Sequence, residues 1–195
     1  MRERILKLLD AIDATLVAHA AEGQCLDLYV IGKAAVILFY DGEQAGAMTL
    51  DVDVVQIGYP PAPLLSVALE QFGKAAPGAK EHDLYLESVP DGIPPLAPGF
   101  KKRCTLMAGE WKVLTVWQPD ANDLAASKLK RYASKDKEDL RHLCDNGLVT
   151  VEQLKLSLNG AFMWETEESG DPGRERAFAN LEKVIAYLEG NAREL

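Results

Sequence analysis

Apolar residues recur every three or four positions over the first twenty residues, with charged residues between them. The series consists of Ile5, Leu8, Leu9, Ile12 and Leu16. This period predicts an amphipathic helix that buries one face. The apolar run 26–31 then predicts a strand, Gly32 permits a tight turn, and the apolar run 34–40 predicts a second helix.

The next predicted strand, 49–55, carries two carboxylates, Asp51 and Asp53. Because side chains alternate across a strand, both carboxylates project from one face and the apolar neighbours project from the other. Asp is depleted in strands, and two like charges this close repel each other. One interpretation is a solvated strand face. With Gly32 upstream we favour the other, a divalent cation held by hard oxygen ligands.

The middle of the chain alternates between apolar segments and proline-rich breaks. The pattern predicts a helix over 64–72, a strand over 83–89, an irregular crossing over 90–98, and a hairpin formed by 104–107 and 111–117.

After Pro119 the pattern becomes helical. Asp120 is placed to cap a helix over 121–133, and Ser134 to cap another helix that runs through Cys144. The remaining predicted elements are a short helix with a capping box of Thr150 and Gln153, a polar loop over 159–173, and a last amphipathic helix that contains Phe178, Leu181, Ile185 and Leu188.

The chain thus divides into a mixed α/β core over residues 1–118 and a helical C-terminal region over 119–195, which we expect to pack on the core. The composition, 48% hydrophobic and 26% charged, is ordinary for a globular protein, and no apolar run approaches the length of a membrane span. Three cysteines without metal-ligand spacing favour reduced thiols in a cytoplasmic protein.

The formal net charge of −9 argues against broad, nonspecific binding to nucleic acid. A local basic island is nevertheless present between residues 123 and 141. Its cations are Lys128, Lys130, Arg131, Lys135, Lys137 and Arg141. The island is compatible with an RNA partner and equally with a solvated helix face.

Several familiar catalytic patterns are missing from the sequence. The three histidines are isolated, the first strand is not followed by Gly-x-Gly-x-x-Gly, and no P-loop or Gly-x-Ser-x-Gly motif occurs. Dinucleotide binding, P-loop chemistry and α/β-hydrolase chemistry are therefore disfavoured. The tryptophans are more typical of core or edge packing than of base stacking.

The order strand, glycine turn, helix, loop and Asp-x-Asp strand resembles that of the polymerase-beta-like nucleotidyltransferase superfamily. More specifically, the chain is similar to the minimal, abortive-infection type nucleotidyltransferases of bacterial toxin–antitoxin systems. Three segments carry the resemblance: Val30-Ile31-Gly32-Lys33-Ala34-Ala35, Thr49-Leu50-Asp51-Val52-Asp53-Val54, and the stretch from Asp123-Leu124 through Lys128-Leu129 to Lys135-Asp136-Lys137-Glu138-Asp139-Leu140. It implies a nucleotidyltransferase-like mixed sheet flanked by helices.

The resemblance also implies roles for individual residues. Asp51 and Asp53 would hold Mg²⁺ or Mn²⁺, and Gly32 and Lys33 would line the phosphates of an NTP. Lys128 would contact the nucleotide phosphates. The remaining position, Asp136, would act as a catalytic acid near the metal or orient basic groups, with Asp139 on the same helix face. Without the resemblance, these helix charges are typical of solvated surface pairs.

The chain departs from the family pattern at several positions. Lys33 stands where a second small residue is usual, the loop 44–48 lacks an arginine, and Ala133 replaces another arginine, although Arg131 lies close. The third carboxylate of the superfamily is expected on a later strand, but 111–117 contains no acid. Glu87 and Glu110 remain as poor substitutes.

Two functions follow from this reading. The first is metal-dependent transfer of a nucleotidyl group from an NTP to a tRNA end or a protein hydroxyl, with an antitoxin as a further possible partner. The second is a degenerate nucleotidyltransferase fold that binds a nucleotide or a partner without turnover.

Overall fold

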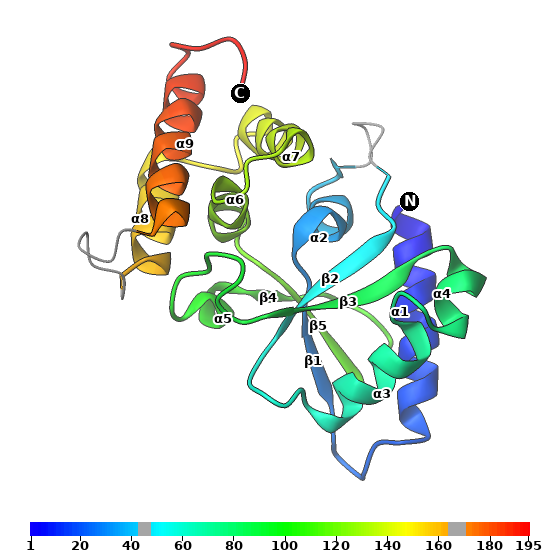
Figure 1. Cartoon of the computed structure of the whole chain (residues 1–195). Helices are drawn as coiled ribbons and strands as arrows, with labels where there is room; N and C mark the ends of the chain where they lie inside the picture. The colour runs from blue at the N-terminus through cyan, green and yellow to red at the C-terminus, as the bar shows by residue number, and fades with distance from the viewer. Residues whose placement is uncertain (43–47, 164–170) are drawn as a thin grey trace. The chain divides into compact units, whose positions relative to one another are not determined.

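The computed structural model describes residues 1–42, 48–163 and 171–195 (Figure 1). Residues 44–47 of the arginine-free loop before the aspartate strand and residues 164–170 of the predicted polar loop lie outside these ranges. The described chain forms two compact units. The α/β unit comprises Met1–Asp91 and Cys104–Pro119, and the helical unit comprises Gly92–Arg103 and Asp120–Leu195.

The α/β unit alternates helices and strands much as the hydrophobic pattern predicts. Its helices are α1 (Arg2–Val17), α2 (Gly32–Phe39), α3 (Pro63–Phe72) and α4 (Pro77–His82). Its strands are β1 (Leu26–Tyr29), β2 (Asp51–Gln56), β3 (Tyr85–Pro90), β4 (Thr105–Leu106) and β5 (Leu114–Gln118). The strands predicted before Gly32, around Asp51 and over 83–89 are thereby confirmed, and so is the hairpin, since β4 and β5 pair antiparallel.

The strands form a small mixed sheet. Strand β1 pairs in parallel with β5, and β2 pairs in parallel with β3. The two ladders meet at an isolated antiparallel bridge between Val30 and Val54, next to which the Ile31 N–H donates to the Asp53 carbonyl oxygen at 2.8 Å. This crossing sets the residues after β1 directly beside the aspartates of β2.

One face of these strands carries the core. Val30, Val52, Val54 and Val116 are fully buried, and helices α1 to α4 pack against one another and against the strands. Burying such aliphatic side chains is the main favourable term in folding. The alternate residues, among them Asp51 and Asp53, therefore lie on the opposite face.

The helical unit is built from the C-terminal helices together with the segment before β4. Its helices are α5 (Phe100–Arg103), α6 (Ala121–Leu129), α7 (Ser134–Asp145), α8 (Val151–Ala161) and α9 (Pro172–Leu188). Their core consists chiefly of Leu124, Leu129, Leu140, Leu143, Leu154, Leu158, Leu181 and Val184. The unit corresponds to the predicted helical region, with the segment 92–103 added.

Side-chain caps explain several of the helix starts in the helical unit. Asp120 accepts the Asn122 N–H at 2.8 Å, and the Thr150 hydroxyl accepts the Gln153 N–H at 3.3 Å, as predicted. The predicted Ser134 cap is wrong. Ala133 occupies the cap position, and the Asp136 carboxylate accepts the Ala133 N–H at 2.9 Å. Because α8 continues to Ala161, the loop also begins later than predicted.

None of the helices in the described part of the chain combines the length and the apolar character that a membrane span needs.

A buried carboxylate anchors α1 to the start of β5. Asp13, only 7% exposed, accepts hydrogen bonds from the backbone N–H groups of Lys112, Val113 and Leu114 at 2.8–3.1 Å. Burial by itself raises the pKa of Asp13, but these hydrogen bonds outweigh it and hold the pKa below the ordinary 3.8. The anchor is therefore a charge-dependent element of the fold.

We expect Asp13→Asn to lower the free energy of unfolding by about 1–3 kcal/mol, because one acceptor is lost and buried N–H groups lose partners. Since the folded-state pKa is depressed, the wild-type contribution is complete above the unfolded value and is lost as the pH falls through the folded value. Urea titrations at pH 7 and pH 3 should show a smaller difference between variant and wild type at pH 3. An equal difference at both pH values would contradict this account.

Candidate functional site

The aspartates of β2 meet a third carboxylate from β3. The parallel register places Glu87 directly beside Asp53, and Tyr85 beside Asp51. Asp51, Asp53 and Glu87 each offer a carboxylate oxygen, and these oxygens lie within 4.8 Å of one another. We call this cluster the acidic triad. Three hard oxygen donors that converge in this way form an arrangement suited to a divalent cation.

Glu87 changes the prediction made from sequence. The third carboxylate was expected on a later strand, with Glu87 as a poor substitute, but the register of β2 and β3 brings Glu87 to the aspartates. The signal was present in the alternation of β3, where Leu86 is buried and Glu87 is exposed. Pairing of β2 with β3, however, could not be read from either strand alone. Glu110 lies in the β4–β5 connection, outside the triad.

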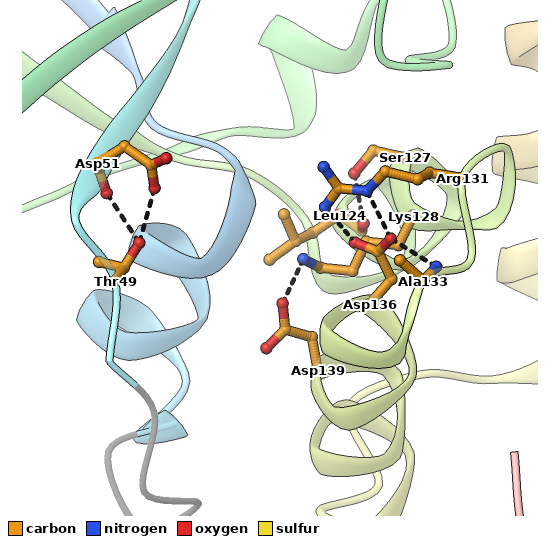
Figure 2. Close-up of polar contacts among 9 residues, drawn as sticks. All are labelled: Thr49, Asp51, Leu124, Ser127, Lys128, Arg131, Ala133, Asp136 and Asp139. Carbon is orange, nitrogen blue, oxygen red and sulfur yellow. Dashed lines mark hydrogen bonds and ion pairs between the residues drawn. The ribbon is translucent and has the colours of Figure 1, made fainter. Parts of the chain in front are cut away.

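Hydrogen bonds orient the Asp51 carboxylate. The Thr49 hydroxyl donates to Asp51 Oδ1 at 2.7 Å (Figure 2), and the Tyr85 hydroxyl lies 3.4 Å from Asp51 Oδ2. Burial, followed by the negative charges of Asp51 and Glu87, raises the pKa of Tyr85. Tyr85 therefore stays protonated near neutral pH and acts as a donor. Each carboxylate oxygen keeps a further lone pair for another ligand.

The glycine turn lies against the second aspartate. Gly32 has a φ of +67°, and a Cβ built on it would overlap Oδ2 of Asp53. Only glycine satisfies both the left-handed backbone and this close approach. Helix α2 starts at Gly32, with no side-chain cap from Ile31, so its first turn begins at the residue that packs against Asp53. The structure thus sets Gly32 against Asp53, and Lys33 follows as the second residue of α2.

In the helical unit, the predicted functional charges are buried and paired. Lys128 and Asp139, which are 4% and 2% exposed, form an ion pair of 2.5 Å between Nζ and Oδ2 (Figure 2). Arg131 forms two bonds of 2.7 Å with the Asp136 carboxylate. The description of these carboxylates as solvated surface charges, which the sequence alone favoured, is therefore wrong.

The surroundings of Asp136 explain why its carboxyl group is ionised. Burial raises the pKa of this carboxyl, but hydrogen bonds from Arg131 and the Ala133 N–H, together with the charge of Lys128, bring the pKa below its ordinary value. Asp136 is therefore an ionised carboxylate that fixes the start of α7. Its part in orienting basic groups fits the contact with Arg131, whereas catalytic roles for Asp136 and Lys128 stay predictions.

A further buried acid lies in α6, at the start of the third segment of the resemblance, where the sequence assigned it no role. Asp123, 1% exposed, accepts two hydrogen bonds from Arg103 of α5 at 2.7 and 2.8 Å. The bidentate geometry is typical of strong Arg–carboxylate pairs. It holds the segment before β4 to the helices, and nothing in the local pattern of either segment signals it.

Comparison with known protein families bears on the chain as a whole. Residues 5–186 match the model of a family described as nucleotidyltransferase of unknown function, DUF6036. The chain belongs to this family of nucleotidyltransferases. Neither a curated protein nor a solved structure matches the chain.

Proposed function

We propose that this protein is a divalent-metal-dependent nucleotidyltransferase that uses an NTP as donor and Mg²⁺ or Mn²⁺ as cofactor. The observation that carries the proposal is the acidic triad on β2 and β3, with Gly32 packed against Asp53, in a member of a nucleotidyltransferase family. Three carboxylates form a donor set that fits a hard cation and leaves positions for phosphate oxygens.

The residues of the α/β unit would have separate roles in binding the metal and the phosphates. Asp51, Asp53 and Glu87 would hold the metal, and the hydrogen bonds from Thr49 and Tyr85 keep Asp51 oriented for it. A bound divalent cation would supply charge neutralisation and in-line alignment at the α-phosphorus. The turn at Gly32 lets the backbone come close to phosphate.

Lys33 and Lys128 are proposed as cationic partners of the phosphates. Lys33 is the second residue of α2, in the turn that packs against Asp53. Lys128 has its charge matched by Asp139 in the helical unit, so contact with a nucleotide would require it to share or exchange that partner. Lys33 is supported by its place in the chain, directly after the glycine that packs against Asp53.

As acceptor we propose a tRNA end or a protein hydroxyl, because the chain resembles the abortive-infection type enzymes. The same resemblance makes a cognate antitoxin a further proposed partner. The basic island supports binding of tRNA less strongly than its number of cations suggests. Lys128, Lys130 and Arg131 are each paired with an aspartate of the helical unit, at 2.5, 3.4 and 2.7 Å. Paired cations release fewer counterions from RNA than unpaired ones.

A second candidate is a nucleotide-binding protein without turnover. The observation that favours it is the internal pairing of Lys128 with Asp139, which occupies the lysine expected to neutralise phosphate charge. Release of pyrophosphate from a bound NTP would separate the enzyme from the binder.

The first test is thermal stability with Mg²⁺ or Mn²⁺ and each of the four NTPs. A ligand at one hundred times its Kd adds about 2.7 kcal/mol to the folded state, which raises the Tm measurably. We expect a metal-dependent rise for wild type and for the exposed control Glu22→Gln, and none for Asp51→Asn or Asp53→Asn. A rise that persists in the aspartate variants would overturn the proposal.

A further inference from the structure

The face of the strands that carries the triad also carries aromatic side chains. Val30 and Val54, which pair across β1 and β2, are both fully buried and so define the core face. Because side chains alternate along each strand, Tyr29 of β1 and Asp53 of β2 lie on the opposite face. Tyr29 and the triad therefore share one surface of the α/β unit.

The strand registers extend this surface away from the triad. Trp117 of β5 is directly beside Tyr29, and Leu106 of β4 is directly beside Trp117. We call Tyr29, Trp117 and Leu106 the aromatic strip, after its two rings. Leu106 is 62% exposed, and both rings are partly exposed. The strip is thus an accessible apolar row that leads across the sheet toward the strand of the aspartates.

The two rings are held as a rigid pair. Tyr29 and Trp117 stack with centroids 6.0 Å apart and an interplanar angle of 10°. The Trp117 indole N–H donates to the Asp27 carboxylate at 2.8 Å, which fixes the direction of the ring. An aromatic surface oriented in advance loses little side-chain entropy when a planar ligand packs on it.

The strip also begins next to the strand of the triad. Tyr29 directly precedes Val30, and Asp53 directly precedes Val54, the bridge partner of Val30. Tyr29 and Asp53 are therefore each one residue from the same bridge, on the face opposite the core. A nucleotide has this layout, because a sugar separates its charged phosphates from its planar base.

We infer that the aromatic strip binds the base of the nucleotide whose phosphates meet the acidic triad. The inference rests on the proposed function and adds a base subsite to it. Stacking on an aromatic surface tolerates every base, because each base has a π face. The strip therefore supplies affinity for nucleosides as a class.

The test compares ATP with inorganic tripolyphosphate, each titrated calorimetrically with Mn²⁺ into the full chain. Loss of one base–aromatic stack costs about 1–3 kcal/mol, or roughly 5- to 150-fold in Kd. We expect Trp117→Leu to weaken ATP by that factor and to leave tripolyphosphate unchanged. Trp111→Leu is the matched control, because Trp111 also donates to an aspartate, Asp10 of α1, but does not belong to the strip.

Variants of Tyr29 keep the test independent of how well Trp117→Leu folds. Tyr29→Phe retains the ring and should bind ATP like wild type, whereas Tyr29→Leu should lose affinity for ATP alone. Unchanged ATP binding in Trp117→Leu and Tyr29→Leu, or an equal loss of ATP and tripolyphosphate, would overturn the inference. If Asp53→Asn leaves ATP binding intact while Trp117→Leu weakens it, the strip stands and the proposed metal site fails.

Discussion

Asp139→Asn should lower the free energy of unfolding of the helical unit by about 3–5 kcal/mol, because the buried ammonium of Lys128 loses the carboxylate to which it donates. Both side chains are at most 4% exposed and meet at 2.5 Å, so water cannot replace the lost partner. We expect Lys128→Met to cost a similar amount, since the buried Asp139 carboxylate then loses the ammonium that neutralises it. Urea unfolding at pH 7, followed by circular dichroism, measures both.

A double variant separates the pair's contribution from the cost of breaking it. Lys128→Met with Asp139→Leu replaces both charges by apolar groups and should recover most of the stability, because neither desolvated charge remains. The exposed pair of Lys7 and Glu3 in α1 serves as the control, and Glu3→Gln should change little. Stability losses in the two single variants no larger than in this control would refute the buried-pair account.

The same double variant also tests the nucleotide role of Lys128. A folded double variant that binds ATP and metal like wild type assigns Lys128 to the fold alone. One that is stable yet binds ATP weakly assigns the lysine to the phosphates. The two roles are therefore separable in one protein.

Glu87→Gln should reduce metal-dependent nucleotide binding by about 100-fold or more, because one of the three carboxylates proposed to hold the metal becomes neutral, and a bound metal supplies several kcal/mol of charge stabilisation. Glu87 is exposed, so the fold should tolerate the change. Calorimetric titration of Mn²⁺ and ATP measures the effect.

Glu110→Gln is the matched control for this prediction. Glu110 was the other sequence candidate for the third acid, it is exposed, and it lies outside the triad. We expect the Glu110→Gln variant to bind Mn²⁺ and ATP with the same affinity as wild type. Equal affinities in Glu87→Gln and Glu110→Gln would show that Asp51 and Asp53 suffice and that Glu87 is a bystander.

Local sequence determined the elements of the α/β unit well. The period of the first helix, the turn at Gly32 and the alternation around Asp51 each express a short-range rule, because helix and strand periods are visible within a single element. The family resemblance rested on the same short segments, and the family comparison confirmed its general part, nucleotidyltransferase.

What the sequence could not show depends on pairing between distant residues. Glu87 joins Asp53 only through a strand register, and Asp123 meets Arg103 across twenty positions. Helix charges such as Asp139 are usually solvated, so a sequence rule assigns them to the surface unless tertiary packing buries them. Ala133 became a cap position because Asp136 supplied the acceptor from within the helix.

The helical unit is discontinuous in sequence, because the segment 92–103 belongs to it. Because this segment lies between β3 and β4, the chain passes from one unit to the other after Asp91, after Arg103 and after Pro119. A gene cut after Pro119 would still encode Arg103 but no longer its partner Asp123. Transfer of the whole helical unit to another protein therefore requires both of its chain segments, 92–103 and 120–195.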